Sequence, residues 1–165
     1  MRPLAILGAR VIDPASGTDA AADILVADRR IAAVGKPEIP SDAQRIEASG
    51  LVAAPGLVDA GVFKSEPAAF LAGGITRTLL MPDQSPVIDD PALAERAQRI
   101  GKPHVWVHPL AAATRGLAGT ELAEVALMKA AGAVGIATGR RQIASAAVMH
   151  RLLQYAAAFD LVTVV

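Results

Sequence analysis

The first third of the chain alternates short apolar runs with turn residues. The apolar runs that are typical of strands are LAILG, ARVID, DILVA, IAAVG, RIEA and LVAA. Segments rich in Pro, Gly, Ser and Asp, such as DPASG and PEIPSD, separate several of these runs. Turn residues between short apolar runs predict hairpins. We therefore expect residues 1–54 to form a small all-β domain, a sandwich-like unit built on an antiparallel sheet.

From Pro55 onward the pattern changes to an alternation of apolar strands and helices. The strand-like runs are GLVDAGV, GITRTLLMP, HVWVHPL, GAVGIA and LVTVV. Helices are predicted near residues 66–72, 91–100, 121–131 and 145–159. Continuous apolar strands separated by helices are typical of a parallel sheet. Pro91 is suited to the first turn of its helix, and Asp90 to its N-cap.

Both an open doubly wound sheet and a (β/α)8 barrel are built from such an alternation. A complete barrel has about 250 residues, whereas 110 residues follow Pro55 in this chain. We therefore predict an α/β fold in which residues 55–165 form an incomplete (β/α) barrel of the TIM type, with about the first four strands. The apolar run LVTVV would leave a sheet edge open. We expect that the chain continues, that a partner supplies strands, or that the sheet is open with a protected edge.

Composition excludes several classes of protein. Hydrophobic residues make up 53% of the chain and charged residues 19%, which indicates a globular protein. Sixteen basic residues balance sixteen acidic ones, and aromatic residues reach only 3%, so neither nucleic acid nor an anionic membrane surface is expected as a partner. The chain has no Cys and no apolar run of membrane-spanning length, from which we expect a cytoplasmic protein.

Three segments resemble a known family. The segment LVAAPGLVDAGVFKSEP resembles the first barrel strand of the amidohydrolase superfamily, which ends in an Asp-x-His-x-His frame. GGITRTLLMPDQSPVIDD is similar to the Gly-Gly-Phe-Thr-Thr and Met-Pro-Asn-x-x-Pro stretch of dihydroorotases, and AATRGLAGTELAEVALMKAAGAVGIA to their third helix and strand. The resemblance covers nearly the whole chain. It implies the fold of a zinc-dependent cyclic-amide hydrolase.

The positions that the resemblance assigns to the metal and the substrate carry other residues here. The two histidines of the family frame are matched by Gly61 and Phe63, which offer no ligand for a metal ion. The arginine that pairs with the substrate carboxylate is matched by Ser65. The family's Asn is matched by Asp83, whose negative charge would repel an anionic substrate.

A fourth departure follows the run GAVGIA. The family carries acidic residues there, near the metals, whereas this chain continues with Thr138, Gly139 and Arg140. Arg140 and Arg141 introduce positive charge, which suits an empty pocket or a bound anion. We therefore expect Ser65, Asp83 and Arg140 to mark a vestigial pocket, with no catalytic residue and no metal cofactor.

The remaining polar candidates have ordinary structural interpretations. His104 and His108 flank a strand, and His150 lies in a predicted helix, so the three histidines are not expected to share a metal ion. Asp59 is predicted to cap a loop or to pair with a neighbouring backbone amide.

The resemblance also implies a partner. Degenerate dihydroorotases associate with aspartate transcarbamoylase, so we expect a non-catalytic scaffold or partner of its catalytic subunit, in a homo-oligomer or a hetero-complex. The alternative is an active zinc-dependent dihydroorotase that is completed by residues outside this chain. A truncated product with no role of its own is a third possibility.

Overall fold

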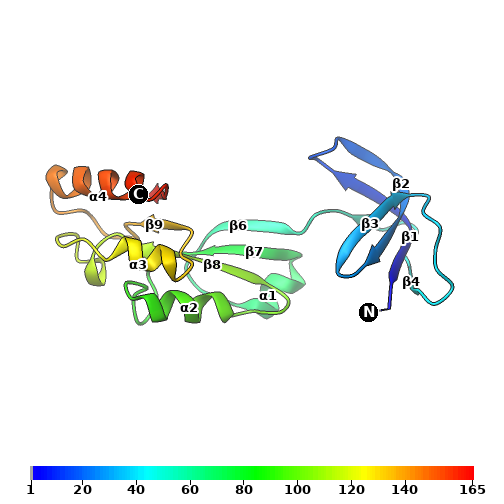
Figure 1. Cartoon of the computed structure of the whole chain (residues 1–165), viewed down its shortest axis with the longest axis horizontal. Helices are drawn as coiled ribbons and strands as arrows, with labels where there is room; N and C mark the ends of the chain where they lie inside the picture. The colour runs from blue at the N-terminus through cyan, green and yellow to red at the C-terminus, as the bar shows by residue number, and fades with distance from the viewer. Residues whose placement is uncertain (1) are drawn as a thin grey trace. The chain divides into compact units, whose positions relative to one another are not determined.

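The computed structural model describes residues 2–165. The chain divides into two compact units, Met1–Pro55 and Gly56–Val165 (Figure 1). Each unit contains one five-stranded sheet. Whether residues 1–54 and 55–165 fold independently as domains stays a prediction.

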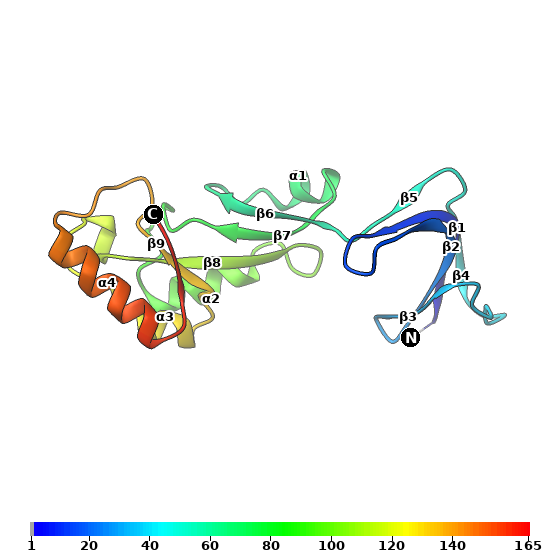
Figure 2. The same ribbon diagram turned by 90° about the horizontal axis from the view of Figure 1, so that it is seen from above.

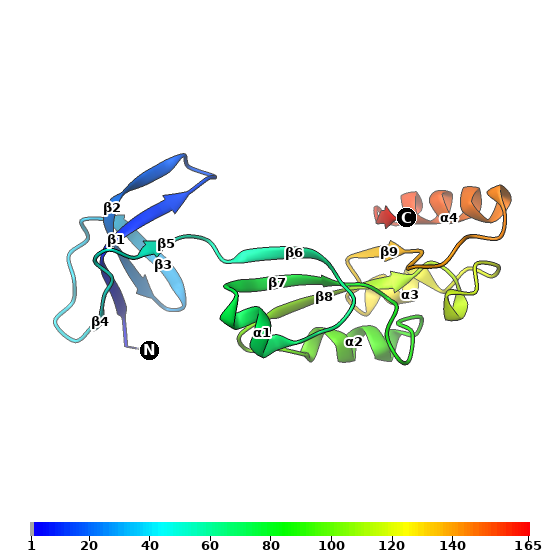
Figure 3. The same ribbon diagram turned by 180° about the vertical axis from the view of Figure 1, so that it is seen from behind.

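The first unit is a mixed sheet. Its strands are β1 (Leu4–Asp13), β2 (Thr18–Ala27), β3 (Arg30–Gly35), β4 (Gln44–Glu47) and β5 (Val52–Ala53). β2 pairs with β1 and β3 in antiparallel fashion, but β4 and β5 pair with β1 in parallel (Figure 3). The prediction of a purely antiparallel sheet was therefore wrong, because the loop after β3 carries the chain across to the other side of β1.

The runs LAILG and ARVID form one strand rather than two. The pairing of β1 with β2 shifts register between Ile6 and Ala9. Gly8 has φ +70°, a left-handed conformation that glycine adopts without a steric penalty. The glycine that resembles a turn in the sequence is thus a bulge within β1.

The second unit is a parallel sheet with the strand order β10-β9-β8-β7-β6. Its strands are β6 (Leu57–Val62), β7 (Ile75–Leu80), β8 (Trp106–Ala112), β9 (Gly135–Ala137) and β10 (Val162–Val164). Figure 2 shows β6, β7 and β8 side by side. Every strand pairs with the next one along the chain, as in a (β/α) barrel, and the order never reverses as it does in a doubly wound sheet. The predicted α/β fold with part of a barrel is confirmed.

Helices cover one face of this sheet. They are α1 (Pro67–Ala72), α2 (Pro91–Arg99), α3 (Val125–Ala130) and α4 (Ala146–Ala158), and a 3-10 turn, η1, spans Arg115–Leu117. Leu80, Ala111 and Ile136 of the strands pack with α2, α3 and α4 in the main core. The adjacent residues Leu110 and Ala137 point to the opposite face, where they form a smaller cluster with Met81. This alternation is the two-residue period of a strand.

Two helices begin at side-chain N-caps, one of which, Asp90, was predicted. Asp90 accepts a hydrogen bond from the Ala92 amide at 2.8 Å and begins α2. Ser145 accepts one from the Val148 amide at 3.3 Å and begins α4. Both are side-chain N-caps, which satisfy amides that have no partner within the helix.

Two predicted elements differ from the structure. α3 begins at Val125 rather than near residue 121, because Leu122 forms an isolated bridge with Thr114 and Glu124 has a non-helical backbone conformation. β8 begins at Trp106, so His104 lies in the turn before the strand instead of within it. Within residues 2–165, every helix is too short or too polar to serve as a transmembrane span.

Substitution of a buried leucine in α4 tests the packing of this core. Leu152 is 0% exposed, whereas its neighbour Leu153 is 48% exposed. We expect Leu152→Ala to lower the free energy of unfolding by about 2–5 kcal/mol, because it leaves a cavity. Leu153→Ala in the same helix controls for helix propensity and should cost less than about 1 kcal/mol. Urea denaturation of both variants measures the difference, and equal losses would contradict this packing.

Candidate functional site

Three of the residues that the sequence singled out meet at one edge of the parallel sheet. The carboxyl ends of parallel strands lie on the same side of a sheet, where barrel enzymes place their active sites. Phe63 follows β6, Asp83 follows β7 and Arg140 follows β9. Residues up to 77 positions apart in the sequence thus come into contact.

Asp83 and Arg140 are joined through both backbone and side chain. The Arg140 amide donates a hydrogen bond to Asp83 Oδ1 at 2.9 Å, and Arg140 Nε lies 3.5 Å from the same oxygen. The Asp83 side chain is only 10% exposed, whereas that of Arg140 is 69% exposed. The carboxylate is therefore shielded, and most of the guanidinium faces solvent.

Phe63 completes this contact. The Arg140 guanidinium carbon lies 4.6 Å from the centroid of the Phe63 ring, a cation-π arrangement. Gln84 Nε2 donates to the carbonyl oxygens of Phe63 at 3.0 Å and Met81 at 2.9 Å. This amide ties the end of β6 to the end of β7. We call Phe63, Asp83 and Arg140 the strand-end cluster.

The other predicted positions do not join the cluster through any hydrogen bond among residues 2–165. Ser65 is half-buried, and its Oγ is buried without a hydrogen-bond partner in that range. Gly61 is exposed on β6, and its amide donates to Asp59 Oδ1 at 3.2 Å. Asp59 thus bonds a neighbouring amide, as predicted. The pocket roles of Ser65, Asp83 and Arg140 stay predictions.

A pocket of about 470 Å³ adjoins the cluster. It is lined by Asp83, Gln84, Val87, Gly116, Leu117, Arg140 and Arg141. Gly116 comes from η1, and its amide donates to Asp89 Oδ2 at 2.7 Å. We call this the strand-end pocket. Its polar lining carries two guanidinium groups and one carboxylate.

The residues at the end of β6 do not fit a metal ion. Gly61 has no side chain and Phe63 has no donor atom, whereas divalent zinc requires nitrogen, sulfur or oxygen ligands. Across residues 2–165, no group of three or more His, Cys, Asp or Glu side chains lies close enough to hold a metal ion. Gly61 and Phe63 therefore cannot hold a metal ion that would activate a water molecule.

The histidines lie apart from the strand-end cluster. His108 Nε2 lies 3.3 Å from Arg77 Nη1 on the neighbouring strand. Burial lowers the pKa of His108 below its usual range, and the charges of Arg77 and Lys102 lower it further. The surroundings of His108 on β8 therefore disfavour the protonated imidazole.

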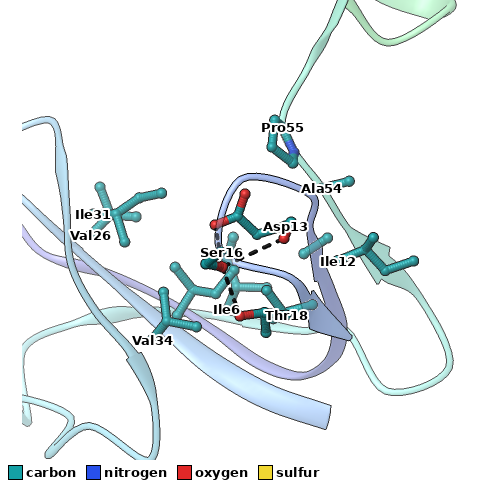
Figure 4. A pocket seen from close by; sticks show the side chains of 13 residues that line it. Ile6, Ile12, Asp13, Ser16, Thr18, Val26, Ile31, Val34, Ala54 and Pro55 are labelled. Atoms are coloured by element: carbon teal, nitrogen blue, oxygen red, sulfur yellow. Dashed lines mark hydrogen bonds between the residues drawn. The ribbon is translucent and has the colours of Figure 1, made fainter. Parts of the chain in front are cut away.

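The first unit has a pocket of its own, of about 450 Å³ (Figure 4). Most of its wall is apolar and includes Ile6, Val26 and Val34. At its polar end, Ser16 Oγ donates to Asp13 Oδ2 at 2.6 Å and lies 2.8 Å from Thr18 Oγ1. These polar atoms satisfy one another, so this pocket offers a ligand mainly apolar contact.

Sequence reasoning missed two residues of the site. Gln84 was not singled out, because a glutamine in a loop carries no pattern that reveals its double hydrogen bond. Gly139 has φ +65°, and a Cβ there would lie 2.6 Å from Asp83 Oδ2. The available signal was the position of Gly139 between a strand and two arginines. A glycine there lets the backbone approach a neighbouring side chain closely.

No family model matches the chain. The chain is similar, however, to curated proteins over nearly its whole length. A "Dihydroorotase-like protein" of Pseudomonas putida is 40% identical over 98% of this chain and 42% of its own length. A "Dihydroorotase" of Syntrophotalea carbinolica is 38% identical over 94% of this chain and 40% of its own length. The chain therefore spans about two fifths of the length of these relatives.

Solved structures share the fold. L-hydantoinase (dihydropyrimidinase) from Arthrobacter aurescens matches with a TM-score of 0.78 at 22% identity, over 99% of this chain and 40% of its own. A dihydroorotase structure matches with a TM-score of 0.66 at 16% identity, over 99% and 50% of the two chains. At these identities the likeness shows the fold alone.

The expectation of no metal cofactor was wrong. Among the structural neighbours, an N-acyl-D-glutamate deacylase from Bordetella bronchiseptica is complexed with zinc, and a D-aminoacylase is described with a binuclear metal center. They share this chain's fold with TM-scores of 0.67 and 0.68. Gly61 and Phe63 stand at two ligand positions at the end of one strand. This chain covers only 44% of each of those two proteins. The exchange of two residues on β6 therefore does not decide the cofactor.

The curated relatives and the structural neighbours agree with the partial barrel and with the segments that resemble dihydroorotase. Over nearly its whole length the chain is similar in sequence to dihydroorotases and dihydroorotase-like proteins, and it shares the fold of L-hydantoinase and of a dihydroorotase.

Proposed function

We propose that this chain is a dihydroorotase-like polypeptide without hydrolytic activity, which binds the catalytic subunit of aspartate transcarbamoylase as a scaffold in pyrimidine biosynthesis. The observation that carries the proposal is the end of β6, where Gly61 and Phe63 stand at the positions of the family's two histidines. The proposal includes a cytoplasmic location for the complex.

The proposed loss of hydrolysis rests on three positions, Gly61, Phe63 and Ser65. Metal-assisted amide hydrolysis requires a water activated at a metal that protein ligands hold in a fixed geometry. β6 supplies no such ligand at Gly61 or Phe63. Ser65 lacks the guanidinium fork that would pair with a substrate carboxylate.

The scaffold role rests on the family. Relatives in Pseudomonas putida and Pseudomonas aeruginosa carry the name "Dihydroorotase-like protein" rather than dihydroorotase, at 40% and 38% identity. The resemblance to degenerate dihydroorotases implies assembly with a transcarbamoylase. A barrel that no longer hydrolyses its substrate can still present the surface on which a partner docks.

The alternative function is an active cyclic-amide hydrolase of the dihydroorotase type, completed by residues outside this chain. The metal-containing structural neighbours and the relatives named dihydroorotase favour it. The two proposals differ in one measurable property, the rate of dihydroorotate hydrolysis.

An activity assay separates them. We expect no hydrolysis of dihydroorotate above the background rate at pH 7 to 8, with or without added Zn²⁺, because Gly61 and Phe63 replace the two histidines of the family frame. The Syntrophotalea carbinolica dihydroorotase, assayed in parallel, is the positive control. Zinc-dependent turnover that a chelator abolishes would establish the alternative.

An assembly measurement tests the scaffold role. We expect the protein, mixed at micromolar concentration with the aspartate transcarbamoylase catalytic subunit of the same organism, to elute as a stoichiometric complex. Size exclusion with light scattering gives the mass of each protein alone and of the mixture, and so also detects a homo-oligomer. An unrelated barrel protein serves as control. Separate elution in low-salt buffer would refute this role.

A further inference from the structure

We propose that the strand-end pocket binds a small oxyanion, a carboxylate or a phosphate, through Arg140 and Arg141. This site depends neither on the partner nor on the loss of hydrolysis. It rests on the geometry of the strand-end cluster and on the charges that line the pocket.

Arg140 is held in place with its donors free. Its backbone amide and its Nε both lie against Asp83 Oδ1, at 2.9 and 3.5 Å, and its guanidinium lies 4.6 Å from the centroid of the Phe63 ring. Within residues 2–165, the two terminal nitrogens donate no hydrogen bond, and the contact of Arg140 with Asp83 runs through its backbone amide and Nε. A guanidinium has a planar fork that matches two oxygens of a carboxylate or phosphate. Prior orientation of the fork lowers the entropy cost of binding.

The exposed charge in the pocket is positive. The Asp83 side chain is only 10% exposed and pairs with Arg140 through Oδ1, while its Oδ2 is buried without a hydrogen-bond partner in residues 2–165, so little of its charge faces the pocket. Arg141 lines the same pocket and forms no ion pair within residues 2–165. The lining therefore presents two guanidinium groups around one buried carboxylate. Such a lining favours an anionic ligand.

The space suits a small molecule. The strand-end pocket has a volume of about 470 Å³, within the range of small-molecule sites, roughly 300–1,000 Å³. Val87 and Leu117 line it beside the arginines and offer apolar contact to the rest of a ligand. A compact organic acid or a phosphate ester has this combination of one anionic group and a short apolar body.

Binding of simple anions tests the site. The probes are inorganic phosphate and malonate, titrated into the protein by calorimetry, with sodium chloride at matched ionic strength as reference. We expect saturable binding at one site per chain for at least one probe. Tighter binding of phosphate would indicate a phosphate site, and tighter binding of malonate would indicate a carboxylate site.

Three variants locate the binding. Arg140→Met and Arg141→Met should each weaken binding by about tenfold, because each removes charge-assisted hydrogen bonds. Arg140→Lys keeps the charge but loses the fork, and it should also weaken binding. Arg151→Met, an exposed arginine of α4 outside the pocket lining, is the matched control and should bind as the unchanged protein does.

Two results would overturn the proposal. One is the absence of saturable binding of either anion by the unchanged protein. The other is equal affinity in the unchanged protein and in Arg141→Met. Arg141 makes no hydrogen bond or ion pair within residues 2–165, so that variant keeps the fold even if Arg140→Met unfolds. The hydrolysis and assembly experiments do not bear on this outcome.

Discussion

Burial of one face of the parallel sheet beneath α2, α3 and α4 is the constraint on which the second unit depends. Leu80, Ile136 and Leu152 are at most 1% exposed, and they join strands and helices in one core. Because a strand alternates its side chains, fixing this face also fixes which residues turn to the other side. The strand ends then stand at one edge, and the loops after β6, β7 and β9 are brought together.

At this edge of the sheet, Asp83 and Arg140 form an ion pair within the chain. A carboxylate in a mostly buried position needs a partner, and Arg140 supplies one from a different loop. Two of the structural neighbours that share the fold of this chain are described with metals. In this chain the same region is occupied by an aromatic ring, an acid and a base. Hydrolysis in the family and oxyanion binding here would use the same edge of the fold with different side chains.

The fold was largely predictable because its signals are local. Apolar runs identified the strands, and Asp90 identified the start of α2. Non-local pairing was not predictable. The parallel partners of β1 depend on where a long loop returns, and the late start of α3 depends on the bridge between Thr114 and Leu122. For the site, the resemblance identified Phe63, Asp83 and Arg140 as positions, but their mutual contact requires the three-dimensional sheet.

The left-handed backbone at Gly139 has a consequence for protein engineering. A methyl group there would overlap Asp83 Oδ2, so the turn after β9 and the acid after β7 are sterically interdependent. Replacement of Gly61 and Phe63 by histidines would remove the aromatic ring beside Arg140. It would leave the loops after β7 and β9 unchanged. A redesign of the loop after β7 or of the loop after β9 would therefore have to accommodate the other loop.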